Sequence, residues 1–374
     1  MIYLDSAATT LEKPAEVYRA VLLAMRSLAS PGRGGYPAAM AAAEEAYRCR
    51  EAAAELFGLR DPERVVFCMN ATHGLNIAIK TLARPGERAL ISGYEHNAVL
   101  RPLHALGAEI RVAAAPLFDA GAAAEAFERE LRAGARLAVV NQVSNVFGFV
   151  QPVDAIAALC RQYGVPLVVD ASQAAGALPV TPERWGAAFV AMPGHKGLYG
   201  PQGTGLLLCG DLPRGRSVRT LIEGGSGSSS RLRDMPAVLP DRLEAGTHNM
   251  PGIAGLRAGL DFVRRVTPER ILRHERELIA LAAELLGEVP GLRVFAAGEP
   301  ELQSGVLSFQ VRDLDCEEAG ARLARLGFSL RTGLHCAPLA HATAGTEEGT
   351  VRMSVSAFTR AGHIRRLAKA LENL

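Results

Sequence analysis

The sequence predicts an α/β protein in which helices cover both faces of a mostly parallel sheet. Seven short apolar runs are bounded by turn residues, and alanine- and leucine-rich stretches with helical spacing, such as 74–82 and 153–163, lie between most of them. Runs this apolar are typical of strands buried on both faces, and their alternation with helices favours parallel pairing. The predicted strands are 64–68, 88–92, 109–113, 136–141, 166–170, 187–192 and 204–209.

Five residues stand at or near the ends of these predicted strands. In parallel sheets, ligands bind beyond the carboxyl ends of the strands. We therefore expect these five residues to converge on one crevice. They are Asn70, Ser92, Asn141, Asp170 and Met192.

The character of the chain changes near residue 255, where long charged amphipathic helices begin. The elements predicted there are helices at 257–266 and 268–288, strands at 292–296 and 305–311, another helix and a final strand at 351–356.

This change predicts two domains. We expect a large domain over residues 16–254, and a smaller α+β domain formed by residues 1–15 and 255–374. The glycine- and serine-rich stretch 223–230 is typical of a flexible linker or of an active-site loop. Inside a compact domain we favour the active-site loop.

Composition and charge favour a small molecule as the main partner. The 374 residues carry a formal net charge of +2, from 41 basic and 39 acidic side chains, without a long run of one sign. This balance argues against nucleic acid or a membrane surface. The N-terminus lacks the features of a secretory signal, and no apolar run approaches the roughly 18 residues that a membrane span needs. We therefore expect a cytoplasmic protein.

The six cysteines include no C-x-x-C pair, so neither a zinc site nor a disulfide framework is expected. Five lie in apolar surroundings and are predicted to be small core residues: Cys49, Cys68, Cys160, Cys209 and Cys316. Cys336 differs, because it follows a histidine in the polar, glycine-containing stretch 331–338. That setting favours a reactive thiol over a buried one.

The glycine-dense loop 192–205 presents one lysine, Lys196, between two predicted strands. Glycines let the backbone approach a ligand closely. A lysine whose pKa falls from about 10.4, through burial or a neighbouring positive charge, can form a Schiff base with an aldehyde. Pyridoxal phosphate is the aldehyde that this loop predicts, and a solvated lysine in a turn is the alternative.

Asp170 ends a wholly apolar predicted strand, where an unpaired charge costs several kcal/mol. It therefore needs a cationic or hydrogen-bonding partner, and a protonated pyridine nitrogen is one, because protonation makes the ring an electron sink. The alternative is an aspartate that caps the following helix.

The segment 70–76 follows a predicted strand and opens a helix, which is a suitable cradle for an anion. Thr72 and His73 are the candidate phosphate contacts there. The alternative is that the polar residues before this helix are plain caps.

Three further side chains are candidates for ligand contacts. The ring of His96 follows another strand end and can stack on a planar cofactor, or it is structural. The amide of Asn145 can hold a substrate carboxylate, or it closes a turn. Arg352, on the final predicted strand, can clamp a carboxylate with two hydrogen bonds, or it forms a surface ion pair.

Taken in order, these segments resemble the class V aminotransferase superfamily, and specifically its cysteine desulfurase and selenocysteine lyase branch. The similarity spans nearly the whole chain. The motifs that carry it lie at residues 3–10, 95–96, 144–148, 170–173, 195–196, 244–247 and 331–338.

The resemblance implies a homodimeric pyridoxal 5'-phosphate enzyme of fold type I, in which Lys196 carries the Schiff base and His96 stacks on the ring. It also implies that Asp170 pairs with the pyridine nitrogen and that Gln173 bonds the ring hydroxyl. The positions that match phosphate contacts are Thr72, His73, His195 and, from the neighbouring subunit, Thr247. The positions that match contacts to the substrate carboxylate are Asn145 and Arg352.

The resemblance further implies that Cys336 attacks the sulfur of L-cysteine, which gives L-alanine and a persulfide on the enzyme. The sulfur would pass to an acceptor protein, as in sulfur mobilisation for iron–sulfur cluster assembly. L-Selenocysteine is the alternative substrate. A different class V reaction, such as transamination or epimerisation, would not need Cys336, and a scaffold without activity would need none of these residues.

The chain departs from the pattern of these relatives in three places. Pro193 stands where many relatives have a phosphate-binding serine, so the phosphate needs other donors. Ser30 and Tyr36 replace the common Asn and His near the substrate entrance, and 358–360 replaces an aromatic-Asn-Thr triplet.

Overall fold

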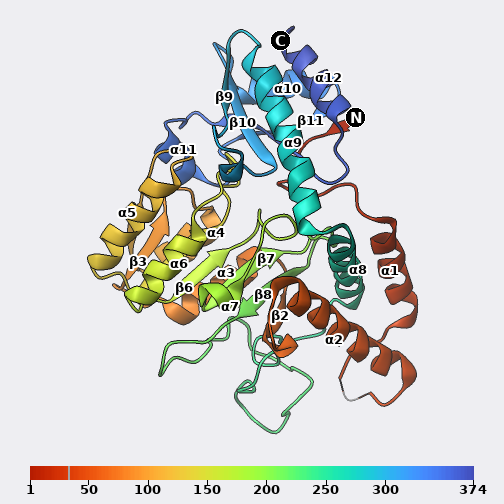
Figure 1. The fold of residues 1–374 in the computed structure, drawn as a ribbon. Helices are drawn as coiled ribbons and strands as arrows, with labels where there is room; N and C mark the ends of the chain where they lie inside the picture. The colour runs from red at the N-terminus through yellow and green to blue at the C-terminus, as the bar shows by residue number, and fades with distance from the viewer. Residues whose placement is uncertain (33) are drawn as a thin grey trace.

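The computed structural model describes residues 1–32 and 34–374, and a seven-stranded sheet with helices on both faces dominates it (Figure 1). The strand order is β2-β8-β7-β6-β5-β3-β4. Neighbours from β7 to β4 pair in parallel, whereas β8 is antiparallel to both β7 and β2. The strands are β2 Val65–Cys68, β3 Arg88–Ser92, β4 Glu109–Ala113, β5 Leu137–Asn141, β6 Leu167–Asp170, β7 Phe189–Pro193 and β8 Gly205–Cys209. The predicted α/β class with a mostly parallel sheet is confirmed.

The two faces of this sheet belong to two hydrophobic clusters, which explains why its strands are wholly apolar. Side chains alternate along a strand, so Val140 and Val169 join one cluster, whereas Val139 and Val168 join the other. Helices α2, α5, α6 and α8 contribute to the first cluster, and α3 and α4 to the second. The bounds are α2 Pro37–Phe57, α3 Ala71–Leu82, α4 Asn97–Ala105, α5 Ala120–Arg132, α6 Val153–Gln162 and α8 Met250–Val266.

A smaller antiparallel sheet of order β12-β13-β10-β9 forms the second layered unit, together with helices α9, α10 and α12. Both termini lie beside it in Figure 1. The bounds are α9 Pro268–Gly287, β9 Leu292–Phe295, β10 Val306–Val311, α10 Cys316–Arg325, β12 Arg331–Gly333, β13 Thr350–Ser354 and α12 Ala361–Leu371. The remaining α-helices and strands are β1 Ile2–Tyr3, α1 Ala15–Ser27, α7 Pro182–Trp185, β11 Phe328–Ser329 and α11 Pro338–Ala344.

The N-terminal residues pair with this second unit, since β1 lies parallel to β11 and Asp5 forms a bridge with Ser354. The predicted domain boundary at residue 254 falls inside α8, and Leu256 and Leu260 of that helix pack in the core of the large sheet. The division into two domains stays a prediction. Among the described residues, no helix combines the length and the apolar character that crossing a membrane requires.

An asparagine caps each of two helices. One is α3, which opens in the segment 70–76 as predicted, and the other is α8, which begins earlier than the predicted residue 257. The side chain of Asn70 accepts a hydrogen bond from the N–H of His73, and α3 begins at Ala71. The side chain of Asn249 accepts one from Gly252, and α8 begins at Met250. Side-chain oxygens at this position satisfy N–H groups that the first helical turn leaves unpaired.

Candidate active site

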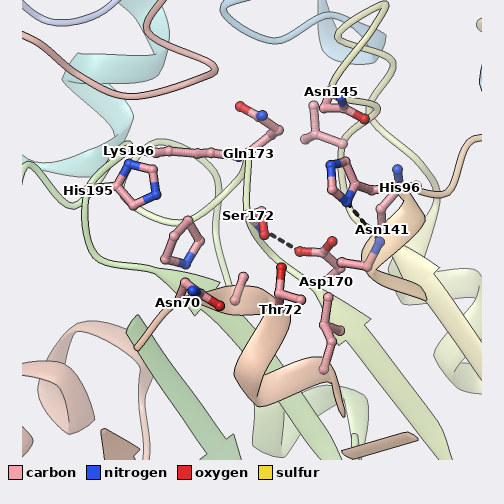
Figure 2. A pocket seen from close by; sticks show the side chains of 15 residues that line it. Asn70, Thr72, His96, Asn141, Asn145, Asp170, Ser172, Gln173, His195 and Lys196 are labelled. Carbon is pink, nitrogen blue, oxygen red and sulfur yellow. Dashed lines mark hydrogen bonds between the residues drawn. The ribbon is translucent and has the colours of Figure 1, made fainter. Parts of the chain in front are cut away.

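A cavity of about 100 Å³ lies beyond the carboxyl ends of the central strands. It brings together seven of the predicted site residues, namely Thr72, His96, Asn145, Asp170, Gln173, His195 and Lys196. In the view of Figure 2, the ring of His96 stands on one side of the opening, and His195 and Lys196 stand on the other. Asp170 lies between them at the end of its strand.

The expectation that five strand-end residues converge is correct for three of them and wrong for two. Asn70, Asn141 and Asp170 line the cavity. Met192 instead packs in the core of the large sheet, and Ser92, which is 1% exposed, donates a hydrogen bond to Glu95. Consecutive side chains point to opposite faces of a strand, so nearness to a strand end does not place a side chain in the crevice.

Asp170 is buried at the end of β6, and the backbone N–H of Ser172 donates to its Oδ1 at 2.9 Å (Figure 2). Turns, and no regular helix, follow it, so the alternative of a plain helix cap is wrong. Gln173 extends from the same turn, and its amide donates to the carbonyl of Ala7 at 3.0 Å. The carboxylate therefore faces the cavity with one local donor.

Lys196 follows β7 in a loop that close backbone contacts hold in place. A Cβ on Gly176 would lie 2.0 Å from the carbonyl oxygen of Gly197, so only glycine fits there. The N–H and the hydroxyl of Thr10 both donate to the carbonyl of His195 at 3.0 Å. The N-terminal segment and the turn after β6 thus fix the direction in which the lysine leaves the sheet.

Burial lowers the pKa of Lys196 to about 8. The guanidinium groups of Arg352 and Arg331 act in the same direction, and the carboxylate of Asp170 acts against them. A substantial fraction of this amine is therefore neutral near neutral pH, which a nucleophilic amine requires.

His96 caps α4, and its Nδ1 accepts a hydrogen bond from the N–H of Ala98 at 2.9 Å. Burial lowers the pKa of this imidazole. A neutral ring whose Nδ1 is an acceptor carries its proton on Nε2. The preceding residue, Glu95, is fully buried, accepts hydrogen bonds from Ser92 and from the N–H of Asn141, and fixes the turn that carries the ring.

The predicted phosphate contacts divide between two cavities. Thr72, at the start of α3, and His195 line the cavity with Lys196, whereas His73 lines a neighbouring cavity of about 210 Å³. Burial lowers the pKa of His195 to about 4, and the charges of Lys196 and Lys13 add to this effect. The Nδ1 atom of His195 is buried without a partner among the described residues.

Arg352 is 2% exposed, so the alternative of a surface ion pair is wrong. Its guanidinium donates to the carboxylate of Asp5 at 3.0 Å and to the carbonyl of Asn145 at 2.9 Å. Within the described part of the chain, its Nε has no hydrogen-bond partner. Arg331 binds the other side of Asp5 at 2.9 Å, so two arginines share one carboxylate.

Cys336 is exposed, and the five other cysteines are buried, as predicted. It lines a surface groove of about 330 Å³ together with Thr72 and His96, which also line the cavity of Lys196. Its carbonyl accepts a hydrogen bond from the N–H of Asn97 at 2.8 Å. The side-chain amide of Asn145 donates to the carbonyl of His335, the residue before Cys336, at 2.8 Å. Two segments of the site thus hold the backbone that carries the thiol.

Thr247 is exposed and lines the neighbouring cavity with His73, away from Lys196 in the same chain. Residues 223–230 do not line the cavity of Lys196 either, as far as the described residues go. The predicted active-site loop is therefore not part of this cavity within one chain.

Three residues of the site were not predicted from the sequence as individual site residues. Ser172 donates to Asp170, and its position two residues after an aspartate is the signal that a local turn provides. The pairing of Asp5 with Arg331 gave no signal, because 326 residues separate them and only the folded chain brings them into contact.

The aminotransferase class-V family model matches residues 2–367. A probable cysteine desulfurase of Methanothermobacter thermautotrophicus is 31% identical over 389 residues, which cover all of this chain and 94% of that protein. A cysteine desulfurase of Salmonella agona is 32% identical over 352 residues, which cover 90% of this chain and 84% of that protein.

Solved structures agree with these relatives. The apo structure of cysteine desulfurase from Thermococcus onnurineus superposes with a TM-score of 0.89 at 27% identity, over all of this chain and 94% of that one. The S-sulfonic acid form of the cysteine desulfurase CsdA from Escherichia coli superposes with a TM-score of 0.85 at 26% identity, over 99% of this chain and 94% of that one. This chain therefore belongs to the class-V aminotransferase family, among the cysteine desulfurases.

Proposed function

We propose that this chain is a pyridoxal 5'-phosphate-dependent cysteine desulfurase that converts L-cysteine to L-alanine and takes the sulfur on Cys336. The observation that carries the proposal is the groove that Cys336 shares with Thr72 and His96 of the lysine cavity. A reactive thiol beside an amine, an imidazole and a carboxylate is the set of groups that this reaction needs.

The residues of the cavity fit the cofactor. The amine of Lys196 matches the aldehyde of the cofactor, and the carboxylate of Asp170 matches its aromatic nitrogen. The hydroxyl of Thr72 and the start of α3 match its phosphate. The buried Nδ1 of His195 lacks a partner among the residues that the structure describes, and an additional polar ligand would provide one. Pro193 has neither a hydroxyl nor an N–H to donate, so the helix start carries more of the phosphate contact here than in relatives with a serine at that position.

When bound, the cofactor supplies an aldehyde that captures the substrate amine and a ring that accepts electrons. The neutral amine of Lys196 takes a proton from the substrate and later returns one. Arg352 binds the substrate carboxylate, and its buried Nε offers one N–H for this contact. The backbone carbonyl of Asn145 accepts a hydrogen bond from Arg352, and this bond holds the side chains of Asn145 and Arg352 next to each other.

The sulfur step balances without an external oxidant. The Cβ–S bond of cysteine breaks, an S–S bond forms between the released sulfur and Sγ of Cys336, and Cβ gains a proton to become the methyl group of alanine. Carbon is reduced as the thiol is oxidised to a persulfide. The exposed position of Cys336 supports transfer of this sulfur to an acceptor protein, with iron–sulfur cluster assembly as one destination.

The chain is proposed to act as a homodimer. Large apolar side chains are exposed on two helices that both pack against α8, which favours burial against a second copy. They are Leu22, Leu23 and Met25 of α1, and Met40 and Tyr47 of α2.

The test compares alanine released from L-cysteine by wild type, Cys336→Ala and Cys316→Ala, each with pyridoxal phosphate and a thiol reductant. Cys316 is a buried cysteine outside the site and serves as the matched control. We expect release by wild type and the control, and none by Cys336→Ala. Equal release by all three would make the thiol incidental and favour another class V reaction. If alanine is released from L-selenocysteine but not from L-cysteine, the substrate is L-selenocysteine.

A further inference from the structure

A buried cluster of charges lies outside the lysine cavity, beneath the segment that carries Thr247. The guanidinium of Arg50, on α2, donates to both carboxylate oxygens of Glu244, at 2.8 and 2.6 Å. His248 Nε2 lies 2.6 Å from the same carboxylate, and the N–H of Phe67 donates to it at 2.7 Å. Each oxygen of Glu244 therefore has two partners.

The packing around this cluster is tight. Arg50 is 7% and Glu244 is 8% exposed, and the guanidinium also lies 4.1 Å from the centre of the Phe67 ring. Burial acts to raise the pKa of Glu244, but His248 and Arg50 outweigh it and hold the pKa below its ordinary value. An ionised pair with this geometry fixes the direction of the backbone at Glu244.

The segment after Glu244 is held at both ends and exposed between them. Gly246 has φ 97°, and a Cβ there would meet no described residue within 4 Å. Asn249, at the far end, caps α8 through the N–H of Gly252 at 3.0 Å. Thr247 is thus carried on a short exposed turn between two anchors.

Thr247 does not reach the site of its own chain. The cavity of about 210 Å³ that it lines shares no lining residue with the cavity of Lys196, within the residues that the structure describes. An exposed hydroxyl on an anchored turn is available to a second molecule instead.

We propose that Arg50 and Glu244 are positioning residues that hold Thr247 for the cofactor phosphate of a second copy of this chain. This inference rests on the proposed function, that is, on the homodimer and on the phosphate contact of Thr247. Anchoring the turn before assembly lowers the entropy that is lost when the contact forms. Arg50 and Glu244 thus affect the strength of the contact between Thr247 and the phosphate, although neither of them touches the phosphate.

The main experiment measures the dissociation constants of pyridoxal phosphate and of pyridoxal, which lacks the phosphate, by absorbance on cofactor-free protein. The variant is Arg50→Met combined with Glu244→Met, because removal of both charges leaves no unpaired charge in the core. We expect affinity for pyridoxal phosphate to fall by about 10- to 100-fold, as for loss of a hydrogen bond to a charged group. Affinity for pyridoxal should stay within about twofold. The matched control is Arg48→Met on the same helix, since Arg48 pairs with Glu44 in solvent.

Thr247→Val separates the failure of this inference from the failure of the proposed function. If Thr247→Val lowers the affinity for pyridoxal phosphate but the double variant does not, the positioning role is overturned. If neither variant changes the ratio of the two affinities, the contact of Thr247 itself is wrong, and the proposed function fails at that residue.

Hybrid dimers test the direction of the effect. One subunit carries Lys196→Ala, so only the other subunit binds cofactor covalently. The double variant should weaken cofactor binding when it lies on the Lys196→Ala subunit, and not when it lies on the subunit with the intact lysine. The opposite pattern, or an equal loss in both arrangements, would overturn the inference. The thermal midpoints of both hybrids, measured in parallel, should agree within about 2 °C.

Discussion

The amine of Lys196 should react with aldehydes and acylating reagents at neutral pH far faster than an ordinary lysine. Burial lowers its pKa from the ordinary 10.5 to about 8. At pH 7 about one tenth of the amine is then neutral, compared with roughly 0.03% for an amine that keeps its ordinary pKa. The neutral form is the nucleophile, so the rate at pH 7 should be about 300-fold higher.

The reactivity of each lysine can be measured separately, because the chain has only four lysines, Lys13, Lys80, Lys196 and Lys369. A short pulse of an amine acylating reagent on cofactor-free protein, followed by peptide mass spectrometry, gives a rate at each lysine and each pH. The rate at Lys196 should rise until about pH 8 and then level. Lys13, whose pKa burial also lowers to about 8, should show a similar midpoint.

Two substitutions should move the midpoint of Lys196 in opposite directions. Arg331→Met removes a positive charge that lowers the pKa, so the midpoint should rise. Asp170→Asn removes a negative charge that raises the pKa, so the midpoint should fall. A rate that keeps rising through pH 10 in the wild type, or a shift of both variants in one direction, would refute the reasoning.

Three further predictions concern stability and the lysine loop. Asp5→Ala should cost about 3–5 kcal/mol in urea unfolding, because Arg352 is 2% exposed and would lose its only carboxylate among the described residues. Burial raises the pKa of Glu95 from 4.5 to about 8, so the folded state keeps a proton that the unfolded state releases. Stability should therefore fall between these pH values by up to about 1.4 kcal/mol per pH unit from this group, and Glu95→Gln should flatten that slope. Gly176→Ala should prevent capture of pyridoxal phosphate, measured by absorbance, because its Cβ would lie 2.0 Å from the Gly197 carbonyl oxygen.

Each of these predictions has a control and a contrary outcome. Asp61→Ala, at an exposed cap, should cost only about 1 kcal/mol, and an equal cost at Asp5 would mean that Arg352 finds other partners. An unchanged pH slope in Glu95→Gln would mean that Glu95 is ionised in the folded protein. Gly134→Ala is the control for Gly176→Ala, because Gly134 has φ 94° against 95° at Gly176, and among the described residues a Cβ there would approach only the Arg88 side chain, at 4.0 Å. If it abolishes cofactor capture as well, backbone strain is the cause and the contact is not.

Structural features that depend on neighbouring residues in the sequence were predicted well. All seven strands of the large sheet were predicted within two residues, because an apolar run between turn residues is a local signal. The exposure of Cys336 followed from its polar, glycine-containing surroundings. The start of α8 was missed by seven residues, since a capping asparagine begins turns that carry no apolar spacing.

Contacts between residues that lie far apart in the sequence could not be predicted. Nothing near Asp5 in the sequence indicates that it binds two arginines more than 320 residues away. Nothing near Thr247 indicates that a buried pair with Arg50 anchors its turn. Side-chain direction was also undetermined, as the burial of Ser92 and Met192 shows.

The sequence by itself determined the class of the fold, the lysine loop and the set of side chains that carry chemistry, because these depend on residue type and local spacing. Tertiary structure alone decided which of those side chains meet. It placed His96, Asp170 and Lys196 around one cavity, with Cys336 beside it, and it left His73 and Thr247 in another. The physical reason is that strand order, side-chain direction and buried ion pairs are fixed when distant segments pack together, and none of these is a property of a local stretch of chain.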